Sequence, residues 1–203
     1  METVDYKAHL RKFYRPISEE VELVEVPRLN FIMIDGSGNP DTSPEYVNAV
    51  DALFAVSNLL KIMVKRGKPP IDYGVMPLEA LWWSNDLSRF SVDRKADWKW
   101  TLMIMQPQII TIKIVAEAVA QTKAKTDLEC LSRIRFEPFE EGRAAQKLHV
   151  GPFTEEGPSL NKIHGRIDSI GAKFSGKHHE VYLSDTRKAV PEKWKTVIRQ
   201  PYV

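Results

Sequence analysis

The sequence predicts an α+β fold in which two similar halves share one antiparallel sheet. Several short segments alternate apolar and polar residues with a period of two, as strands do. In each half a strand runs into a Gly/Pro loop and then a helix with N-cap signals, at residues 33–45 and again at 148–156. We therefore expect two strand–helix–strand–strand repeats. Their helices would cover one face of the sheet and leave the other face curved and open, with a ligand cleft between the halves.

The domain organisation follows from length and composition. At 203 residues, 43% of them hydrophobic, the chain is long enough for a single domain whose halves share a core. Residues 1–18 are charged and aromatic without a clear period, and we expect an arm that lies over the body. The first half then comprises residues 19–106, and the second half comprises residues 107–203.

The first half begins with two strands, at residues 21–26 and 30–35, and a loop that starts at Gly36. Ser43 is a favourable N-cap for the helix that follows, which ends near Arg66. Two further strands and an intervening hairpin loop complete this half, at residues 74–84, 98–106 and 85–89 respectively.

The second half begins with a short helix capped by Thr111. A longer helix is expected to be capped by Thr154, to carry Glu155 and Glu156 in its first turn, and to end at Gly171. The strands of this half are expected at residues 133–139, 143–150, 178–185 and 196–200.

Charge and composition exclude several classes of function. Lysine and arginine exceed aspartate and glutamate by only two, and no dense basic block is present, which disfavours nucleic-acid binding. No apolar run approaches the ~20 residues that span a bilayer, and the N-terminus lacks the features of a signal peptide. We therefore expect a cytoplasmic protein with no membrane partner. The single cysteine, Cys130, excludes an internal disulfide and is expected to pack as a small hydrophobe.

The strand at residues 178–185 carries the candidate catalytic residues. Because side chains alternate along a strand, Glu180 and Tyr182 point to one face, while Val181 and Leu183 point to the other. If the two aliphatic residues face the core, a carboxylate and a phenol stand together on the opposite face.

Four of the five tryptophans form two close pairs that are suited to holding a flat aromatic molecule. Trp82 and Trp83 are adjacent in a strand, so at most one of them is expected to line the groove. Trp98 and Trp100 share a face, which is either groove or core, and Glu79 shares its face with Trp83. The candidate substrate-binding residues are Tyr73, Glu79, Trp83, Trp98 and Trp100.

The histidines indicate neither a metal site nor a hydrolytic triad. His178 and His179 are adjacent in a strand and point apart, and no cysteine or further histidine has fitting spacing. His149 and His164 lie on different elements without a serine nucleophile motif nearby. We expect no metal and no cofactor.

Six segments of the sequence carry a resemblance to a known family, at residues 31–40, 76–83, 98–107, 149–158, 176–185 and 191–201. They resemble the GyrI-like small-molecule-binding superfamily. Residues 142–203 are similar to the C-terminal half of its members, and the earlier segments are similar to a stand-alone branch with a Trp-Trp motif.

This resemblance implies two pseudo-symmetric βαββ units joined into an antiparallel sheet with a central groove. In the multidrug-sensing regulators of the superfamily, that groove binds flat, often cationic aromatics around a buried glutamate, which Glu180 matches. The helix-turn-helix domain of those regulators has no counterpart in this sequence. The stand-alone branch resembles hydrolases that protect cells by opening the strained ring of cyclopropanoid DNA-alkylating genotoxins.

The candidate residues suit this ring opening. Glu180 in a tryptophan-lined groove of low dielectric is expected to have a raised pKa and to take a proton from water. Tyr182 or Tyr73 would donate a hydrogen bond to the phenolate that forms.

Three functions remain open from the sequence. The first is the cyclopropanoid hydrolase, with Glu180 essential. The second is binding or sequestration of flat aromatic or cationic molecules without chemistry, with Glu180 as counter-charge. The third is an interaction protein directed at gyrase. The first two imply a planar aromatic small molecule as partner, and both a monomer and a homodimer are compatible with the sequence.

Overall fold

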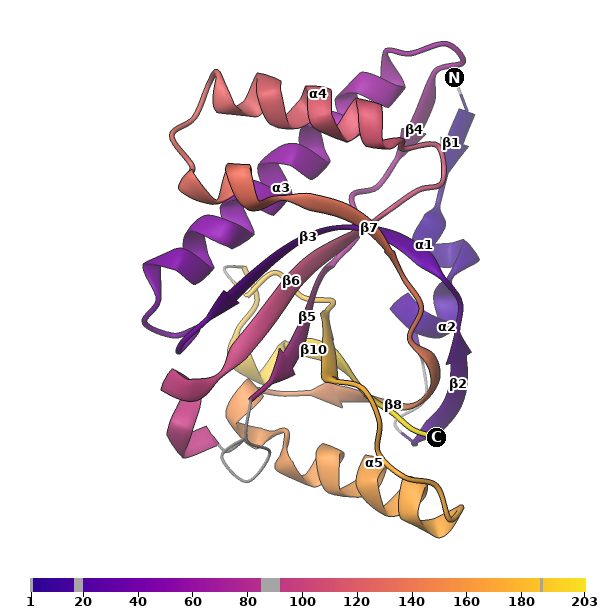
Figure 1. Ribbon diagram of the computed structural model, residues 1–203. Coiled ribbons are helices and arrows are strands. Elements are labelled where there is room, and N and C mark those ends of the chain that lie inside the picture. The colour runs from indigo at the N-terminus through magenta and orange to yellow at the C-terminus, as the bar shows by residue number, and fades with distance from the viewer. Residues whose placement is uncertain (1, 17–19, 85–91, 187) are drawn as a thin grey trace.

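The computed structural model describes residues 2–16, 20–84, 92–186 and 188–203. Within these residues, eight strands form one antiparallel sheet that curls through the centre of the molecule (Figure 1). In their order across the sheet they are β2 (Glu22–Val26), β8 (Gly142–Val150), β10 (Lys195–Pro201), β9 (His178–Tyr182), β5 (Leu78–Trp83), β6 (Lys99–Gln106), β3 (Leu29–Ser37) and β7 (Arg135–Phe139).

The sheet consists of two equivalent units, which confirms the predicted duplication. β3, helix α3 (Pro44–Lys65), β5 and β6 form the first unit, and β8, helix α5 (Gly157–Ser169), β9 and β10 form the second. The outer strands are exchanged between them. β2 precedes β3 in the chain yet pairs with β8, while β7 precedes β8 and pairs with β3. The units meet where β5 pairs with β9, from Leu78 opposite Tyr182 to Trp82 opposite His178.

The residues before the sheet lie along its body. β1 (Glu2–Val4) pairs in parallel with β4 (Ile71–Tyr73), and the short helices α1 (Tyr6–His9) and α2 (Arg11–Tyr14) follow. The remaining elements are helix α4 (Ile112–Lys123), which packs on α3, and the 3-10 helices η2 (Val92–Asp97), η3 (Glu129–Arg133), η4 (Phe153–Glu155) and η5 (Pro191–Lys193).

Helix α3 is the long core helix of the first unit. The Ser43 side chain caps it by accepting a hydrogen bond of 3.2 Å from the amide of Tyr46, as its sequence predicts. By length and composition alone this helix would be apolar enough to cross a membrane. It packs against β3 and β6, where Leu53 and Leu60 are fully buried. Polar residues such as Asn58 interrupt its apolar positions, which is why no continuous apolar run is visible in the sequence.

Several predicted boundaries are corrected by the structure. β3 continues through Ser37, so the loop begins later than Gly36. The strand expected at residues 74–84 is shorter, because only Leu78–Trp83 pairs with its neighbours. The hairpin loop expected at residues 85–89 lies outside the described residues. Cys130 is buried, as predicted, and burial raises the pKa of its thiol.

Gly36 lies in β3 directly beneath the Trp100 indole, which explains why a glycine occupies this strand. A Cβ atom built on Gly36 would lie 2.1 Å from Cη2 of Trp100, well inside van der Waals contact. Trp100 is fully buried and has no room to withdraw. The close approach therefore requires the absence of a side chain at this position.

We expect Gly36→Ala to lower the free energy of unfolding by about 1–3 kcal/mol, because the indole must be displaced in a packed core. Urea unfolding followed by tryptophan fluorescence measures this change. Gly74→Ala is the matched control, since no atom lies within 4 Å of a Cβ built there. Equal effects of the two substitutions would contradict this explanation of Gly36.

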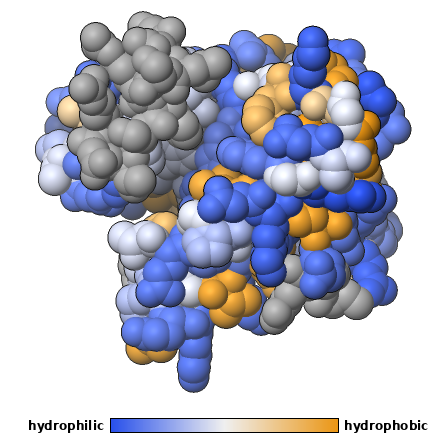
Figure 2. All heavy atoms as spheres, turned by 90° about the horizontal axis from the view of Figure 1, so that it is seen from below, coloured by the Kyte–Doolittle hydropathy of each residue, from blue (hydrophilic) through white to orange (hydrophobic). Residues whose placement is uncertain are grey.

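The surface on the α5 side of the molecule carries its apolar side chains in separate patches between hydrophilic ones (Figure 2). Exposed large hydrophobic residues of the protein include Phe174, at 49% exposure, and Ile170, at 39%. Scattered exposed hydrophobic residues of this kind are normal for a folded domain.

Candidate functional site

A groove of about 1140 Å³ lies over the central strands β9 and β5. Since α3 packs on β3 and β6, and α5 packs on β8 and β10, the helices leave these central strands uncovered between them. The groove therefore opens on the same face as the helices, and the expectation of an open face opposite the helices is wrong. Its aromatic walls are formed by Tyr46, Phe54, Trp82, Trp83, Trp98, Phe153, Phe174 and Tyr182.

Alternation along β9 places the two predicted catalytic side chains in this groove. Glu180 and Tyr182 both line it, whereas Val181 between them is fully buried on the other face. The Glu180 carboxylate is only 13% exposed. Glu180 and Tyr182 therefore share one face, as strand alternation predicts, and their roles in chemistry remain predictions.

Glu180 is held by its own strand neighbours. The Tyr182 hydroxyl donates a hydrogen bond of 2.6 Å to Oε2 of Glu180, and Nε2 of His178 lies 3.0 Å from its Oε1. Trp82 in turn donates from its Nε1 to the Tyr182 hydroxyl at 3.2 Å. Tyr182 therefore orients Glu180, and its proton is already engaged. This corrects the prediction that Tyr182 donates to the ligand.

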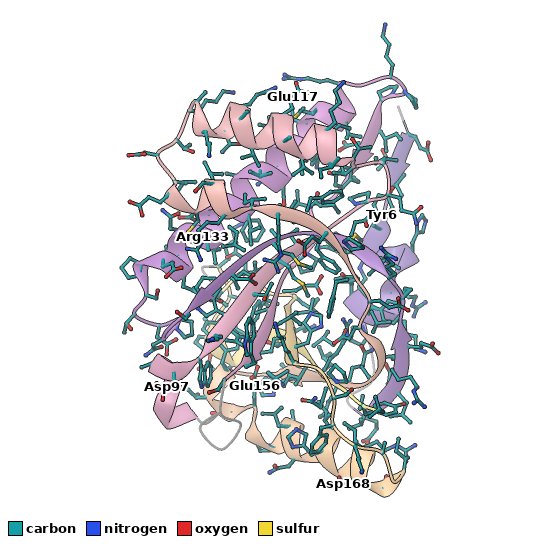
Figure 3. The ribbon with its side chains drawn as sticks, viewed as in Figure 1. Tyr6, Asp97, Glu117, Arg133, Glu156 and Asp168 are labelled. Atoms are coloured by element: carbon teal, nitrogen blue, oxygen red, sulfur yellow. The ribbon has the colours of Figure 1, made fainter. Side chains whose placement is uncertain are left out.

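A second carboxyl group, Glu156, also lines the groove, although its sequence context predicted only a position in the first turn of a helix. The helix expected to be capped by Thr154 begins only at Gly157, so Glu156 occupies the N-cap position. Its side chain makes no capping hydrogen bond and is buried. In Figure 3, Glu156 lies among the side chains beneath the central strands, whereas Asp168 lies near the far end of α5.

Glu156 and Glu180 interact directly and have opposite pKa shifts. Burial, together with the adjacent charge and hydrogen bond of Glu180, raises the pKa of Glu156 to about 10. Burial also acts to raise the pKa of Glu180, but hydrogen bonds from His178, Tyr182 and Glu156 outweigh it and lower this pKa. The expectation of a raised pKa for Glu180 is therefore wrong.

At neutral pH the pair consequently holds one proton, which resides on Glu156, and carries one negative charge. Two interacting carboxyl groups cannot both ionise readily, so the ionised Glu180 helps to keep the proton on Glu156. Among the described residues, Oε1 of Glu156 is buried without a hydrogen-bond partner. A buried polar atom of this kind in a groove is suited to contact a ligand or a water molecule.

Tyr46 supplies a neutral phenol in the same groove. Burial and the nearby Glu180 carboxylate raise its pKa well above the ordinary value for tyrosine. Its ring stacks on Trp82, with centroids 6.0 Å apart. Tyr46 lies on α3, one helical turn from the N-cap, and nothing in the periodicity of that helix distinguishes it from a core residue.

The tryptophans divide between groove and core. Trp83 and Trp98 line the groove, as predicted, and Trp82 does so as well. The expectation that only one of the adjacent pair could do so is wrong, because Trp83 ends β5, where its ring reaches the rim. Trp100 is fully buried over Gly36 and belongs to the core, so its prediction as a groove residue is wrong.

Tyr73 and Glu79 also lie outside the groove lining, which corrects both predictions. Tyr73 is buried on β4, with its ring edge-on to Tyr6 of the N-terminal segment at 6.0 Å. Glu79 points through β5 to the opposite face of the sheet. There it accepts a hydrogen bond of 2.6 Å from Tyr14 and lies 3.0 Å from Nε2 of His179.

Glu79 is part of a buried ionic network beneath the groove. His179 lies between Glu79 and Glu141, with its Nδ1 2.8 Å from Glu141. Arg199 lies 3.5 Å from Glu141 and donates to the backbone oxygen of Phe13 at 2.6 Å. The network joins β5, β9 and β10 across the seam between the two units. Within the described ranges, no three His, Cys, Asp or Glu side chains are arranged to hold a metal ion.

The network predicts a stability that depends on pH. Burial acts to lower the pKa of His179, but Glu141 and Glu79 outweigh it and raise the pKa to about 9 from the ordinary 6.5. The stabilisation that protonated His179 gives the fold is complete below the pKa of His179 in the unfolded chain. It is lost as pH rises through the pKa of His179 in the folded protein. We expect the free energy of unfolding to fall by about 3 kcal/mol across this interval.

Urea unfolding at about pH 6 and about pH 10 tests this, with His179→Gln as the comparison. Between about pH 6 and about pH 10, the free energy of unfolding of the wild type should fall by about 3 kcal/mol more than that of the variant. An identical loss in both proteins would rule out His179 as the source.

A family model described as the GyrI-like small molecule binding domain matches residues 19–203. An uncharacterized conserved protein from Listeria innocua is 38% identical with a TM-score of 0.91, and the match covers 98% of this chain and all of that one. A hydrolase from Listeria innocua is 37% identical with a TM-score of 0.89, and the match covers both chains completely.

The C-terminal domain of EcmrR is only 11% identical, with a TM-score of 0.55 over 91% of this chain and 97% of that one, and it shares the fold alone. A comparison with curated proteins found no significant match. The motifs of both halves, the duplicated sheet and the match over residues 19–203 agree: the chain belongs to the GyrI-like small-molecule-binding family.

Proposed function

We propose that this protein is a hydrolase that adds water to electrophilic, cyclopropane-bearing aromatic compounds of the DNA-alkylating type. The observation that carries this proposal is the carboxyl pair Glu156 and Glu180, which shares one proton within an aromatic-walled groove. Near-full-length relatives at 37% identity that are called hydrolases support the reaction class. Hydrolysis would remove the alkylating group in the cytoplasm and so protect the cell.

In the proposed reaction, the planar ring system lies between the aromatic walls and presents a methylene carbon of its spiro-fused cyclopropane to the carboxyl pair. Glu180, the ionised member, accepts a proton from a water molecule whose oxygen bonds to that carbon. The carbon–carbon bond of the cyclopropane breaks, and its electron pair moves through the ring to the carbonyl oxygen, which becomes a phenolate. The phenolate takes a proton from solvent and Glu180 returns its own, so the net change is addition of one water.

The neighbours of Glu180 have supporting roles. Tyr182 and His178 fix the orientation of its carboxylate, and orientation within the groove makes the attack effectively unimolecular. Because Glu156 is protonated, the site carries only one negative charge, which keeps the groove compatible with a neutral substrate. Tyr46 is the neutral phenol that would turn from Tyr182, its hydrogen-bond neighbour, to donate a hydrogen bond towards the developing phenolate.

The direct test is incubation of purified protein with a duocarmycin-type compound. Liquid chromatography with mass detection should show a ring-opened alcohol formed much faster than in buffer, and in ¹⁸O-labelled water the new hydroxyl should carry the label. Consumption at the rate seen in buffer alone would overturn the proposal.

Binding without chemistry is the second candidate, and the preformed aromatic groove favours it independently of the carboxyl pair. In that case a flat ligand would quench tryptophan fluorescence and be recovered unchanged after prolonged incubation. Recovery of the intact cyclopropane would therefore separate sequestration from hydrolysis.

A further inference from the structure

Two lysines of the chain itself lie on the aromatic walls of the groove. The Lys177 ammonium lies 3.3 Å from the centroid of the Trp83 ring, and Lys95 lies 5.8 Å from that of Trp98. Both distances are within the range of a cation–π interaction. A ring stacked on Trp83 needs about 3.5 Å, so the Lys177 ammonium occupies the place that a ligand would take on that face.

Lys177 is the less constrained of the two. Lys95 is also paired with Asp41 at 2.6 Å, whereas Lys177 makes no hydrogen bond or ion pair with any described residue. Lys177 is half-buried, and this burial lowers the pKa of its ammonium. Its principal contact is therefore the face of Trp83.

The carboxylates that line the interior of the groove already have partners within the protein. Glu180 already receives hydrogen bonds from its neighbours, and the protonated Glu156 is neutral. At the rim, Asp41 pairs with Lys95 and Asp185 lies 3.3 Å from Lys188. Asp51, on the exposed side of α3, is screened by water. A cationic ligand would therefore meet a single interior carboxylate whose oxygens already have hydrogen-bond partners, and it would meet an ammonium on the face of Trp83.

We propose that Lys177, by occupying the face of Trp83, is a specificity-determining residue that makes the groove select neutral flat aromatics with acceptor oxygens over aromatic cations. An incoming neutral carbonyl or phenolic oxygen can accept a hydrogen bond from this ammonium, whereas a cation must displace it against charge repulsion. The inference deepens the proposed function by assigning the charge of its ligands, and it concerns binding in the same groove.

The test uses two unreactive ligands with one ring framework, neutral 10-methylacridone and cationic 10-methylacridinium, with affinities measured by quenching of tryptophan fluorescence. We expect the wild type to bind the acridone at least about tenfold more tightly. In Lys177→Met, which keeps the length of the side chain, the affinity for the cation should rise about tenfold while that for the acridone changes little or falls.

Lys162→Met is the control for the loss of one charge, because Lys162 is exposed on α5 outside the groove lining and should leave both affinities unchanged. Lys177→Arg retains a cation and should preserve the wild-type preference, so the inference remains testable even if the methionine variant folds poorly. Equal wild-type affinities, or equal changes for both ligands in Lys177→Met, would overturn it. Neither ligand contains a cyclopropane, so absence of hydrolysis would leave this result intact and would count against the proposed function alone.

Discussion

Glu180→Gln is expected to lower the rate of ring opening by about 100- to 10,000-fold, the usual contribution of a positioned general base. The amide keeps the size of the carboxylate but cannot take a proton from water. It can still accept from Tyr182, so the fold and the groove should be retained. Single-turnover formation of the ring-opened alcohol, with enzyme in excess, measures the chemical step directly.

Glu155→Gln is the matched control, because Glu155 precedes the groove carboxyl Glu156 in the chain but is exposed. It should leave the rate unchanged. Ligand quenching by 10-methylacridone should be similar in the wild type and both variants, since the aromatic walls are intact. If Glu180→Gln opened the ring at a rate within a few fold of the wild type, Glu180 would not be the general base of the reaction.

Glu141→Gln is expected to lower the free energy of unfolding by about 3–5 kcal/mol, the usual cost of removing one partner from a buried ion pair. The Glu141 side chain is 1% exposed and lies against both His179 and Arg199, which are themselves 1% exposed. The amide removes one of the two negative charges, those of Glu141 and Glu79, that balance these two cations, and water cannot replace it. Urea unfolding at neutral pH measures the loss.

Glu140→Gln provides the comparison, because Glu140 is adjacent in the chain and exposed, where a single charge contributes ~0–1 kcal/mol. A loss for Glu141→Gln no larger than this would show that the network is energetically unimportant. Since the network lies beneath β9, the larger loss should also be accompanied by weaker protection of the β9 amides in hydrogen exchange.

Local patterns in the sequence predicted most of the elements of this fold. The Ser43 cap and the Gly171 terminus mark the ends of two helices, and Gly171 has the positive φ of 69° that its position requires. The exchange of β2 and β7 between the units was not predictable in this way. Pairing between strands far apart in the chain leaves no trace in the local period of either strand.

Site residues inside a strand were predicted, because strand alternation determines the face on which their side chains lie. Glu156, which lies outside the strands, was missed. Alternation along β9 placed Glu180 and Tyr182 on one face, as the structure has them. Glu156 was assigned to the positive end of a helix, which is the common role of such a carboxylate. Pro158, within the first turn of α5, was the available signal, because it favours a helix beginning at Gly157 and so leaves Glu156 outside it.

Strand alternation also gave a wrong prediction at the end of β5. It tied Glu79 to the face of Trp83, and within the strand Glu79 follows the rule by pointing away from Trp82. Trp83 is the terminal residue, where its long side chain can turn over the rim to meet Lys177. A period of two is reliable inside a strand and is a poor guide at its last residue.

The central claim is that Glu156 and Glu180 share one proton inside the groove. Infrared difference spectroscopy of the wild type against Glu156→Gln tests it at neutral pH, in the absence of any substrate. We expect a carbonyl band of a protonated carboxylic acid in the wild type, absent in the variant and lost only as pH approaches about 10. A wild-type spectrum without that band at neutral pH would contradict the claim.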